Sequence, residues 1–250
     1  MRNLHIGTMG WSYNFWKESF YPENLQANEF LKFYSSKLDT VEADSTFYRI
    51  PRESTVLNWK AQTPNNFIFS LKFPRIITHI KMLKNCEDET RVFLERVELL
   101  GEKLGALLLQ LPPSFQKEQV PLLEKFLRPL PKTHRYVVEI RNKTLLKASL
   151  FSTLQENKVS LAWVDSALPP QVSEVTSDFI YVRWQGDRKK VNGALGKTEI
   201  DKANEIRLWA SKLKTYVENG KEVFGYYSKY YSGNPTADAQ YFLSYVKNEK

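Results

Sequence analysis

The sequence has few of the residues on which disulfides, metal centres and membrane anchors depend. It contains one cysteine, Cys86, so no disulfide can form within the chain, and a reducing cytoplasm is its expected location. Three histidines lie far apart in the sequence, and no His-Glu-x-x-His or Cys-x-x-Cys pattern is present. No apolar run approaches the roughly 20 residues of a membrane-spanning helix, and polar Arg2 and Asn3 follow Met1. We therefore expect neither a membrane partner nor a signal peptide.

Acidic residues are the minority among the charged ones. Lys and Arg number 36 against 28 Asp and Glu, which gives a net charge of +8 and a pI of about 9.3. Such a surplus favours an anionic partner, either a small molecule or a nucleic acid, through long-range attraction. A lysine-rich surface that only aids solubility accounts for it equally well. Composition leaves the oligomeric state open.

Short apolar runs alternate along the chain with segments of helical periodicity. The runs, rich in β-branched and aromatic residues as buried parallel strands are, cover Leu4–Met9, Thr40–Phe47, Phe67–Phe73, Gly105–Leu111, Tyr136–Arg141, Ser160–Asp165, Phe179–Gln185 and Glu222–Tyr227. Only Ser166–Asp178 lacks a helical pattern, and it contains Pro169 and Pro170. We predict an α/β chain that forms a single (β/α)8 TIM-type barrel over residues 1–250, with the helix between strands six and seven short or missing.

Polar residues gather at the carboxyl ends of these predicted strands. Because side chains alternate along a strand, parity assigns each one to a face. In the second run Glu42 and Asp44 lie opposite Val41 and Ala43. The other polar residues placed at strand ends in this way are Ser70, Lys72, Gln110, Glu139, Arg141, Asp165, Tyr181, Arg183 and Gln185.

The carboxyl ends of barrel strands are where barrel enzymes build their active sites. We expect the catalytic residues to come from Glu42, Asp44, Lys72, Glu139 and Asp165. The expected substrate-binding residues are Trp11, Tyr48, Arg75, His79, Gln110, Arg141, Arg183 and Lys197. The structural alternative is an ion-pair network that plugs the barrel, with Glu139 paired to Lys72 and Asp44 to Arg141.

Schiff-base chemistry and metal binding are two further possibilities at this end of the barrel. Lys72 is a candidate Schiff-base lysine, because burial would free its amine, but we favour a charged partner of neighbouring carboxylates. We identify no cofactor. A divalent metal held by carboxylates and His79 is not favoured, because the cations that share the space would repel it.

The glycine-containing segment Gly193–Thr198 resembles a phosphate-binding loop, but Val191 stands where the first glycine of that motif belongs. We predict that it precedes a helix starting near Glu199, with Thr198 and Asp201 as its capping box. Loops after strands seven and eight of barrels often bind phosphate. The alternative is a mobile solvated loop whose basic residues are Arg188, Lys189, Lys190 and Lys197.

The aromatic residues that follow the first strand have two interpretations. Trp11, Tyr13, Trp16 and the Phe20–Pro22 segment either pack the long first loop or stack on a sugar or base. Packing is the default for most of them.

Ordered motifs over almost the whole chain resemble the domain-of-unknown-function family 72, the YecE-like family. They are Gly7–Tyr13 with Trp16 and Phe20–Pro22, Thr40–Glu42, Ser45–Tyr48, Phe69–Lys72, Pro74–Arg75, Thr78–His79, Gln110–Phe115, Glu139–Arg141 and Tyr181–Arg183. The resemblance implies a TIM-type barrel and no settled biochemical activity. It also implies that Asp44 replaces a usual Asn, Gln185 a usual His, and Tyr226–Ser228 a Phe-Asn-Asn-like motif, so an activity that relies on those groups is altered or lost.

The leading hypothesis is an enzyme, a hydrolase or lyase using carboxylate and lysine acid–base chemistry, that acts on an anionic, phosphate-bearing substrate. The alternative is a non-catalytic nucleic-acid-binding barrel. The substrate, the reaction and any metal requirement do not follow from the sequence.

Overall fold

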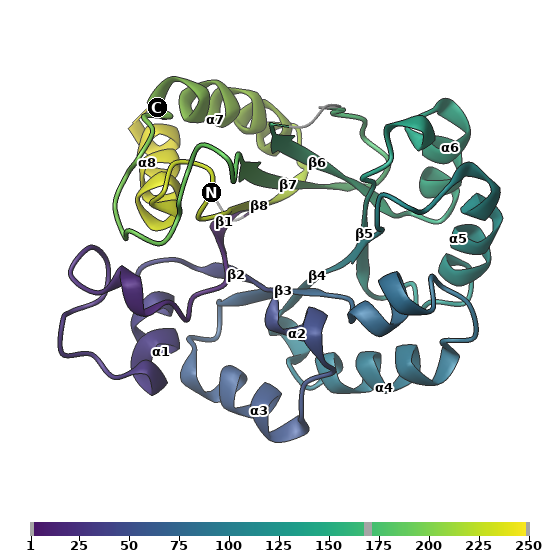
Figure 1. Cartoon of the computed structure of the whole chain (residues 1–250), viewed down its shortest axis with the longest axis horizontal. Helices are drawn as coiled ribbons and strands as arrows, with labels where there is room; N and C mark the ends of the chain where they lie inside the picture. The colour runs from purple at the N-terminus through teal and green to yellow at the C-terminus, as the bar shows by residue number, and fades with distance from the viewer. Residues whose placement is uncertain (1–2, 168–171, 249–250) are drawn as a thin grey trace.

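The computed structural model describes residues 3–167 and 172–248 and shows a closed parallel barrel, as predicted (Figure 1). Each strand pairs with the next along the chain, and the first pairs with the last. The strands are β1 (Leu4–Met9), β2 (Thr40–Ala43), β3 (Ile68–Lys72), β4 (Leu104–Gln110), β5 (Arg135–Glu139), β6 (Ser160–Ser166), β7 (Phe179–Gly186) and β8 (Glu222–Tyr227). Because all neighbours are parallel, the carboxyl ends of all eight strands meet at one end of the barrel, here called the mouth.

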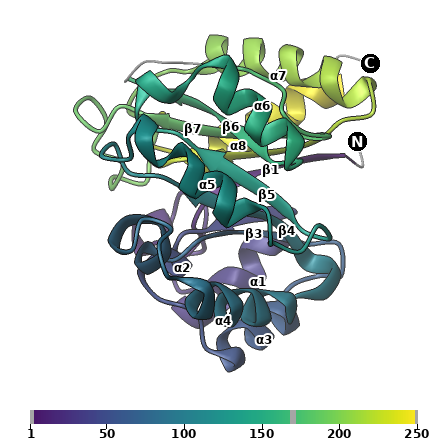
Figure 2. The same ribbon diagram turned by 90° about the vertical axis from the view of Figure 1, so that its right-hand side faces the viewer.

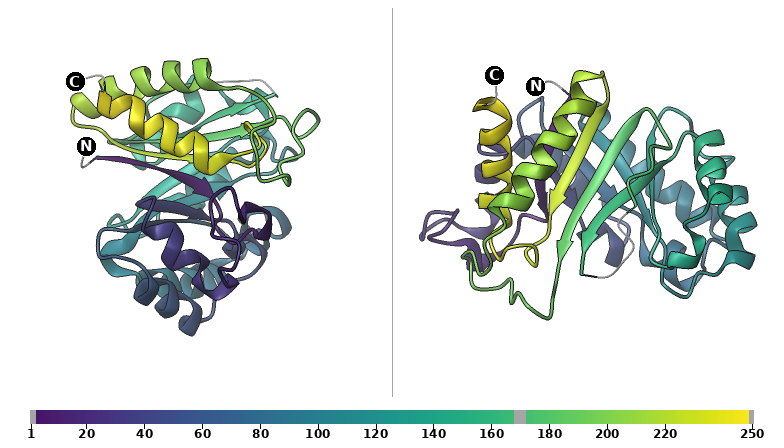
Figure 3. Two further views of the ribbon diagram at one scale, coloured as in Figure 1. Left: turned by 90° about the vertical axis from the view of Figure 1, so that its left-hand side faces the viewer. Right: turned by 90° about the horizontal axis from the view of Figure 1, so that it is seen from above.

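Helices surround this ring of strands (Figures 1 and 2). They are α1 (Phe30–Ser35), α2 (Ser45–Tyr48), α3 (Glu53–Gln62), α4 (Glu87–Glu98), α5 (Val120–Leu127), α6 (Ala148–Glu156), α7 (Ala203–Glu218) and α8 (Pro235–Asn248). Short helical turns add η1 (Asn14–Trp16), η2 (Ala27–Glu29), η3 (Ile76–Ile80), η4 (Gly101–Lys103), η5 (Lys117–Gln119) and η6 (Lys143–Leu145). The helices α7 and α8 lie side by side, next to β8 (Figure 3). Among the helices of residues 3–167 and 172–248, none is both long and apolar enough to cross a membrane.

The core has two layers, and strand parity divides them as predicted. Side chains such as Phe69, Val138 and Val182 belong to the large cluster between the sheet and the helices. The alternate positions, including Leu108 and Tyr181, form a smaller cluster inside the ring. Full burial of an apolar side chain of this size contributes about 1.5–3 kcal/mol. The barrel interior is therefore packed, and polar side chains have room only at its ends.

The second strand ends earlier than the sequence predicts. It stops at Ala43, and Ser45–Tyr48 forms the single turn α2 instead of continuing the strand. The hydroxyl of Thr46 explains the change. It lies 2.9 Å from the carbonyl oxygen of Ala43 and 2.6 Å from that of Lys72, and it accepts a hydrogen bond from the Lys72 amide. These contacts replace strand pairing and fix α2 over the end of β3.

Two connecting segments predicted from the sequence can be compared with the structure. The link from β6 to β7 contains no helix in its described residues, 167 and 172–178, as expected. The helix predicted to start near Glu199 starts instead at Ala203. The predicted capping box of Thr198 and Asp201 is replaced by a single contact, in which the Asp201 carboxylate accepts a hydrogen bond from the Ala203 amide at 2.9 Å.

Candidate functional site

One arginine holds two buried glutamates together inside the mouth. The guanidinium of Arg183, on β7, donates to both carboxylate oxygens of Glu42 on β2, at 3.0 and 2.7 Å. Its remaining terminal nitrogen donates to Glu139 on β5 at 2.5 Å. All three side chains are almost inaccessible, at 3% exposure or less. The predicted plug pairs, Glu139 with Lys72 and Asp44 with Arg141, are thus replaced by a cluster centred on Arg183.

Further polar side chains complete the hydrogen bonding of the two glutamates. The phenol of Tyr181 donates to Glu42 at 2.6 Å. The amides of Gln110 and Gln185 donate to Glu139 at 2.7 and 3.2 Å. A buried charge is tolerated only when it is paired and hydrogen-bonded. These contacts therefore make the floor of the mouth rigid and leave it little capacity to bind a ligand.

The same arginine leaves the two glutamates with opposite shifts in acidity. Burial raises the pKa of Glu42 to about 7, although Arg183 opposes the shift. Burial is also the largest influence on Glu139, but Arg183 and Arg141 outweigh it and lower the pKa of Glu139 to about 2. The difference follows from the neighbours, because Glu42 has Asp44 beside it, whereas Glu139 has a second arginine. Glu139 is therefore ionised at neutral pH, and Glu42 exchanges its proton near neutrality.

Lys72 lies at the end of β3 and pairs with no carboxylate in the part of the chain that the structure describes. Its side chain is buried, at 8% exposure. The ammonium sits 4.0 Å from the centre of the Phe47 ring, and within the described residues it makes neither a hydrogen bond nor an ion pair. Burial, followed by repulsion from Arg183, lowers the pKa of Lys72, although Asp44 and both glutamates oppose the shift. The favoured interpretation, a charged partner of neighbouring carboxylates, stays a prediction: Asp44, Glu139 and Glu42 act on Lys72 electrostatically, but within the described residues none of them forms an ion pair with it.

The rim beside Lys72 carries three positive side chains around one histidine. His79, on η3, meets the Phe47 ring edge-on at 5.0 Å, and its Nδ1 lies 2.8 Å from the hydroxyl of Thr78. Burial lowers the pKa of His79, and Lys72, Arg141 and Arg75 lower it further, in that order. Arg75 is exposed, and Arg141 is 39% exposed while its Nε donates to Glu139 at 3.0 Å. We call Lys72, Arg75 and Arg141 the rim cations.

Asp44 lies between this rim and the buried floor. One carboxylate oxygen is 3.8 Å from Arg183, and the side chain is 36% exposed. That oxygen, Oδ1, is buried and has no hydrogen-bond partner among the described residues. Asp44 is therefore a carboxylate of the mouth that solvent can reach, whereas Glu42 and Glu139 are not.

Asp165 does not join the mouth. Its carboxylate accepts a hydrogen bond from the indole of Trp209 on α7, at 2.8 Å. Along β6 it has the parity of Leu161 and Trp163, which pack outward, whereas Ala162 belongs to the inner cluster. The alternation that placed Glu42 and Arg183 therefore also indicates that Asp165 lies outside the ring.

Three further candidates lie away from the floor. Trp11 packs against Trp59 and Phe69, with ring centres 5.5 and 6.3 Å away. Tyr48, on α2, is 73% exposed. Lys197 is an exposed residue of the loop after β7. Trp11 is thus in contact with the aromatic core, and its expected role in substrate binding stays a prediction.

The glycine-containing loop after β7 already holds an anionic group of its own. The Glu199 carboxylate accepts hydrogen bonds from the amides of Asn192 and Gly193, at 2.8 and 2.7 Å. Gly196 has a left-handed φ of +64°, and a side chain there would collide with the carbonyl oxygen of Phe15. The loop is therefore fixed against the first loop, and two amides that would suit a phosphate are bound to Glu199.

Metal ligands do not converge in this arrangement. In residues 3–167 and 172–248 no three His, Cys, Asp or Glu side chains lie close enough together to hold an ion. The two mouth glutamates direct their oxygens at Arg183 instead.

The family described as "Protein of unknown function DUF72" matches residues 5–250. The chain belongs to the DUF72 family. The UPF0759 protein YecE of Escherichia coli K12 is 34% identical over 139 residues, which cover 56% of this chain and 48% of YecE. The chain thus aligns with about half the length of YecE. The UPF0759 protein YunF of Bacillus subtilis is 24% identical over 94% of this chain and 91% of its own length.

Solved DUF72 structures have the same fold. A family protein from Thermotoga maritima superposes with a TM-score of 0.79 at 25% identity, covering 98% of this chain and 99% of its own. One from Enterococcus faecalis gives 0.77 at 23% identity, covering 98% and 95%. These relatives confirm the predicted family and barrel, and the family description names no activity.

The departures from the family pattern lie in different parts of this DUF72 chain. Asp44 and Gln185 both face the mouth, where Gln185 still donates to Glu139. Tyr226 lies deeper inside the barrel, and its phenol is 2.8 Å from the hydroxyls of both Thr40 and Ser70. Tyr227 points outward and stacks on Trp184 at 4.1 Å. Asp44 and Gln185 therefore change the chemistry of the mouth, whereas Tyr226 and Tyr227 lie away from it.

Sequence reasoning missed two residues of the mouth. Phe47 was read as part of a strand, although α2 presents its ring to both Lys72 and His79. Tyr181 was placed on the correct face without a role, yet it donates to Glu42. Parity was a sufficient signal for Tyr181, whereas nothing local in the sequence shows that the strand ends before Phe47.

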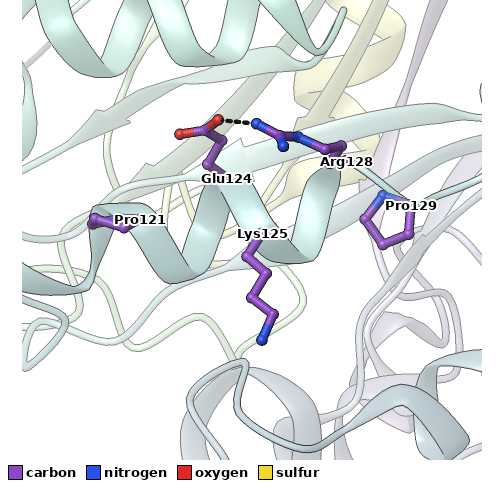
Figure 4. A pocket seen from close by; sticks show the side chains of 5 residues that line it. All are labelled: Pro121, Glu124, Lys125, Arg128 and Pro129. Atoms are coloured by element: carbon purple, nitrogen blue, oxygen red, sulfur yellow. Dashed lines mark hydrogen bonds and ion pairs between the residues drawn. The ribbon is translucent and has the colours of Figure 1, made fainter.

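Two surface hollows of the DUF72 chain lie on its helices. The first, of about 290 Å³, is lined by Pro121, Glu124, Lys125, Arg128 and Pro129 around α5 (Figure 4). Two of its charged side chains, Glu124 and Arg128, form an ion pair with each other at 2.6 Å. The second is lined by residues of α7 and α8, among them Arg207 and Tyr245. Neither hollow contains a residue of the mouth.

Proposed function

We propose that this DUF72 protein is an enzyme that acts on an anionic, phosphate-bearing substrate at the mouth of its barrel. The observation that carries the proposal is Lys72, a side chain only 8% exposed whose ammonium makes neither a hydrogen bond nor an ion pair within the described residues. A largely desolvated cation without a partner is costly, so an anionic ligand at this ammonium would relieve a cost that the free protein bears.

The charges around Lys72 support an anion more than a cation. The mouth contains three carboxylates, Glu42, Glu139 and Asp44, against Arg183 and the three rim cations, which leaves one positive charge in excess. Protonation of Glu42, whose pKa is raised to about 7 by burial, would add to that excess at neutral pH. Within the described residues Arg141 uses only its Nε, on Glu139, so its two terminal nitrogens are available to two oxygens of a phosphate.

The carboxylates divide into different proposed roles. Asp44 is accessible and lies beside the rim, so we assign it the proton transfer to or from the substrate. Glu42 lies beneath it as a positioning residue that exchanges a proton near neutrality. Glu139 stays ionised and orients Arg183 and Arg141. Such groups suit a hydrolase or lyase, and we expect the protein to work in the cytoplasm.

Nucleic acid remains the weaker alternative. It draws on the same net charge of +8, but the aromatic residues after β1 are engaged with one another. Trp16 and Tyr21, for example, are each 1% exposed. No specific observation favours a stacking surface for bases there.

Calorimetric titration with inorganic phosphate at low ionic strength tests the proposal. The double variant Arg75→Gln with Arg141→Gln should lose at least about tenfold in affinity, since tenfold corresponds to only about 1.4 kcal/mol. Lys197→Gln, which removes an exposed cation of the other loop, is the matched control and should keep the wild-type affinity. Absence of phosphate binding, or an equal loss in the control, would contradict the proposal.

A further inference from the structure

We propose that Lys72 is a nucleophilic amine that forms an imine with the substrate, and that the substrate is therefore an aldehyde or ketone carrying a phosphate group. This inference rests on the proposed anion-binding mouth and names the chemical class of its ligand. It returns to Lys72 the Schiff-base role that the sequence made the less favoured alternative.

A second buried lysine in the same chain shows what is unusual about Lys72. Lys103 is 6% exposed, close to the 8% of Lys72. Its ammonium, however, donates to the carbonyl oxygens of Lys60 and Thr63, both at 2.7 Å, and lies 3.2 Å from the Thr63 hydroxyl. Three such contacts hold the nitrogen as a charged structural donor. Lys72 has a single cation–π contact with the face of Phe47 in place of these three hydrogen-bond contacts.

The surroundings of Lys72 also favour its neutral form. Burial and the Arg183 charge both lower its pKa, which enlarges the fraction of free amine at neutral pH. Asp44 is close enough to act on this pKa in the opposite direction, so a proton acceptor lies within electrostatic reach. His79 is a second one, because burial lowers the pKa of its imidazole, and Arg141 and Arg75 lower it further.

The proposed step balances without any oxidant or reductant. The Nζ lone pair attacks the carbonyl carbon, and the π electrons move to the oxygen. Two protons then reach that oxygen, both from the amine nitrogen, with Asp44 or His79 as the relay. The oxygen leaves as water while the carbon–nitrogen double bond forms. One amine and one carbonyl thus give one imine and one water, and Arg75 and Arg141 hold the phosphate throughout.

Pyridoxal 5′-phosphate is a suitable probe, because it joins an aldehyde to a phosphate. The full chain is incubated with the probe, reduced with borohydride and digested, and the modified lysines are located by mass spectrometry. Because pyridoxal, which lacks the phosphate, closes to an internal hemiacetal, each probe is scored by the labelling of Lys72 relative to exposed lysines. We expect this ratio to be at least about tenfold higher with the phosphorylated probe than with pyridoxal. Inorganic phosphate should slow the reaction, and Lys103 should stay unmodified.

Variants separate the amine from the charge. Lys72→Arg keeps the positive charge and should abolish the adduct while circular dichroism shows an intact fold. Lys103→Arg is the matched control and should leave the modification of Lys72 unchanged. Arg141→Gln should slow the reaction with the phosphorylated aldehyde but not the reaction with pyridoxal.

The outcomes distinguish this inference from the proposed function. If phosphate binds the mouth but Lys72 is not modified, or if modification follows surface exposure among all lysines, the imine is overturned and the anion site stands. If Lys72 reacts equally with both aldehydes and phosphate does not compete, the nucleophilic amine is supported and the phosphate site fails.

Discussion

Two basic regions lie at the carboxyl ends of the barrel strands, and they differ in what already neutralises them. After β7, the amides of the glycine loop bind the carboxylate of Glu199, and the lysines around them are exposed. Beside β3, the rim cations include Lys72, whose ammonium has no carboxylate partner among the described residues. Sequence gives both regions the same appearance, a cluster of positive charge near a strand end. Within the described residues they differ in that the second holds a largely buried lysine without a carboxylate partner, whereas the lysines of the first are exposed to solvent.

The largest effect is expected for Arg183→Met, which tests whether the mouth charges depend on one another. Removing the guanidinium leaves buried Glu42 without its cation and buried Glu139 with Arg141 alone, which should lower the free energy of unfolding by about 3–5 kcal/mol. In the other region, Arg188→Met removes an exposed side chain that lies over Tyr230 and should cost less than about 1 kcal/mol.

Urea denaturation of both variants measures this pair. If Arg183→Met lowers the free energy of unfolding no more than Arg188→Met does, the buried cluster does not stabilise the mouth. The two basic regions would then not differ in this respect.

The second prediction concerns Glu42→Gln and the dependence of stability on pH. Burial raises the folded-state pKa of Glu42 from 4.5 to about 7. Between these values the folded protein binds more protons than the unfolded chain, so its stability should fall as pH rises, by at most about 1.4 kcal/mol per pH unit for one group. Glu139, with its pKa lowered to about 2, acts in the opposite direction between about pH 2 and 4.5.

Chemical denaturation from pH 4 to pH 8 should therefore show a decline that Glu42→Gln reduces. Asp238 on α8 is the matched control, because burial raises its pKa to about 7 as well. Asp238→Asn should remove its own share of the decline and leave that of Glu42. If the free energy of unfolding of Glu42→Gln falls with pH as steeply as that of the wild type, Glu42 does not bind a proton near neutrality.

How far the sequence predicts this site depends on whether the deciding contact is local. Alternation along β2, β5 and β7 was enough to place Glu42, Glu139 and Arg183 on one face, because parity is a property of each strand alone. It would also have excluded Asp165, whose parity matches the outward Trp163. That candidate was wrongly grouped with the mouth because its position at a strand end was given more weight than its face.

Contacts between distant segments account for the remaining differences. The end of β2 depends on the Thr46 hydroxyl reaching the backbone of Lys72, 26 residues away. Whether the amides of the glycine loop are available to a ligand depends on Glu199, whose carboxylate accepts hydrogen bonds from them. Which carboxylate Arg183 pairs with depends on three strands meeting across the barrel. No periodicity encodes such meetings, so the sequence predicted the place of the charges better than their pairing.

The third prediction concerns Glu199→Ala, which should give the loop after β7 an open anion site like the one proposed for the mouth. Glu199→Ala leaves the amides of Asn192 and Gly193 without their acceptor and should lower the free energy of unfolding by about 1–2 kcal/mol. Because the vacated site suits an anion, added phosphate should restore part of the loss. Thermal unfolding with phosphate or with chloride at equal ionic strength measures this, and equal recovery in both salts would show that the loop has no specific anion site.

The smallest effect is expected for Asp165→Asn on phosphate binding at the mouth. The Asp165 carboxylate accepts a hydrogen bond from Trp209 outside the ring, so its replacement should change the phosphate dissociation constant by less than about twofold. Asp44→Asn is the matched variant inside the mouth. It removes a negative charge beside the rim cations and should tighten phosphate binding, because less charge then repels the ligand. If Asp165→Asn changed the affinity as much as Asp44→Asn did, the boundary between the mouth and the outer helix layer would lie elsewhere than strand parity puts it.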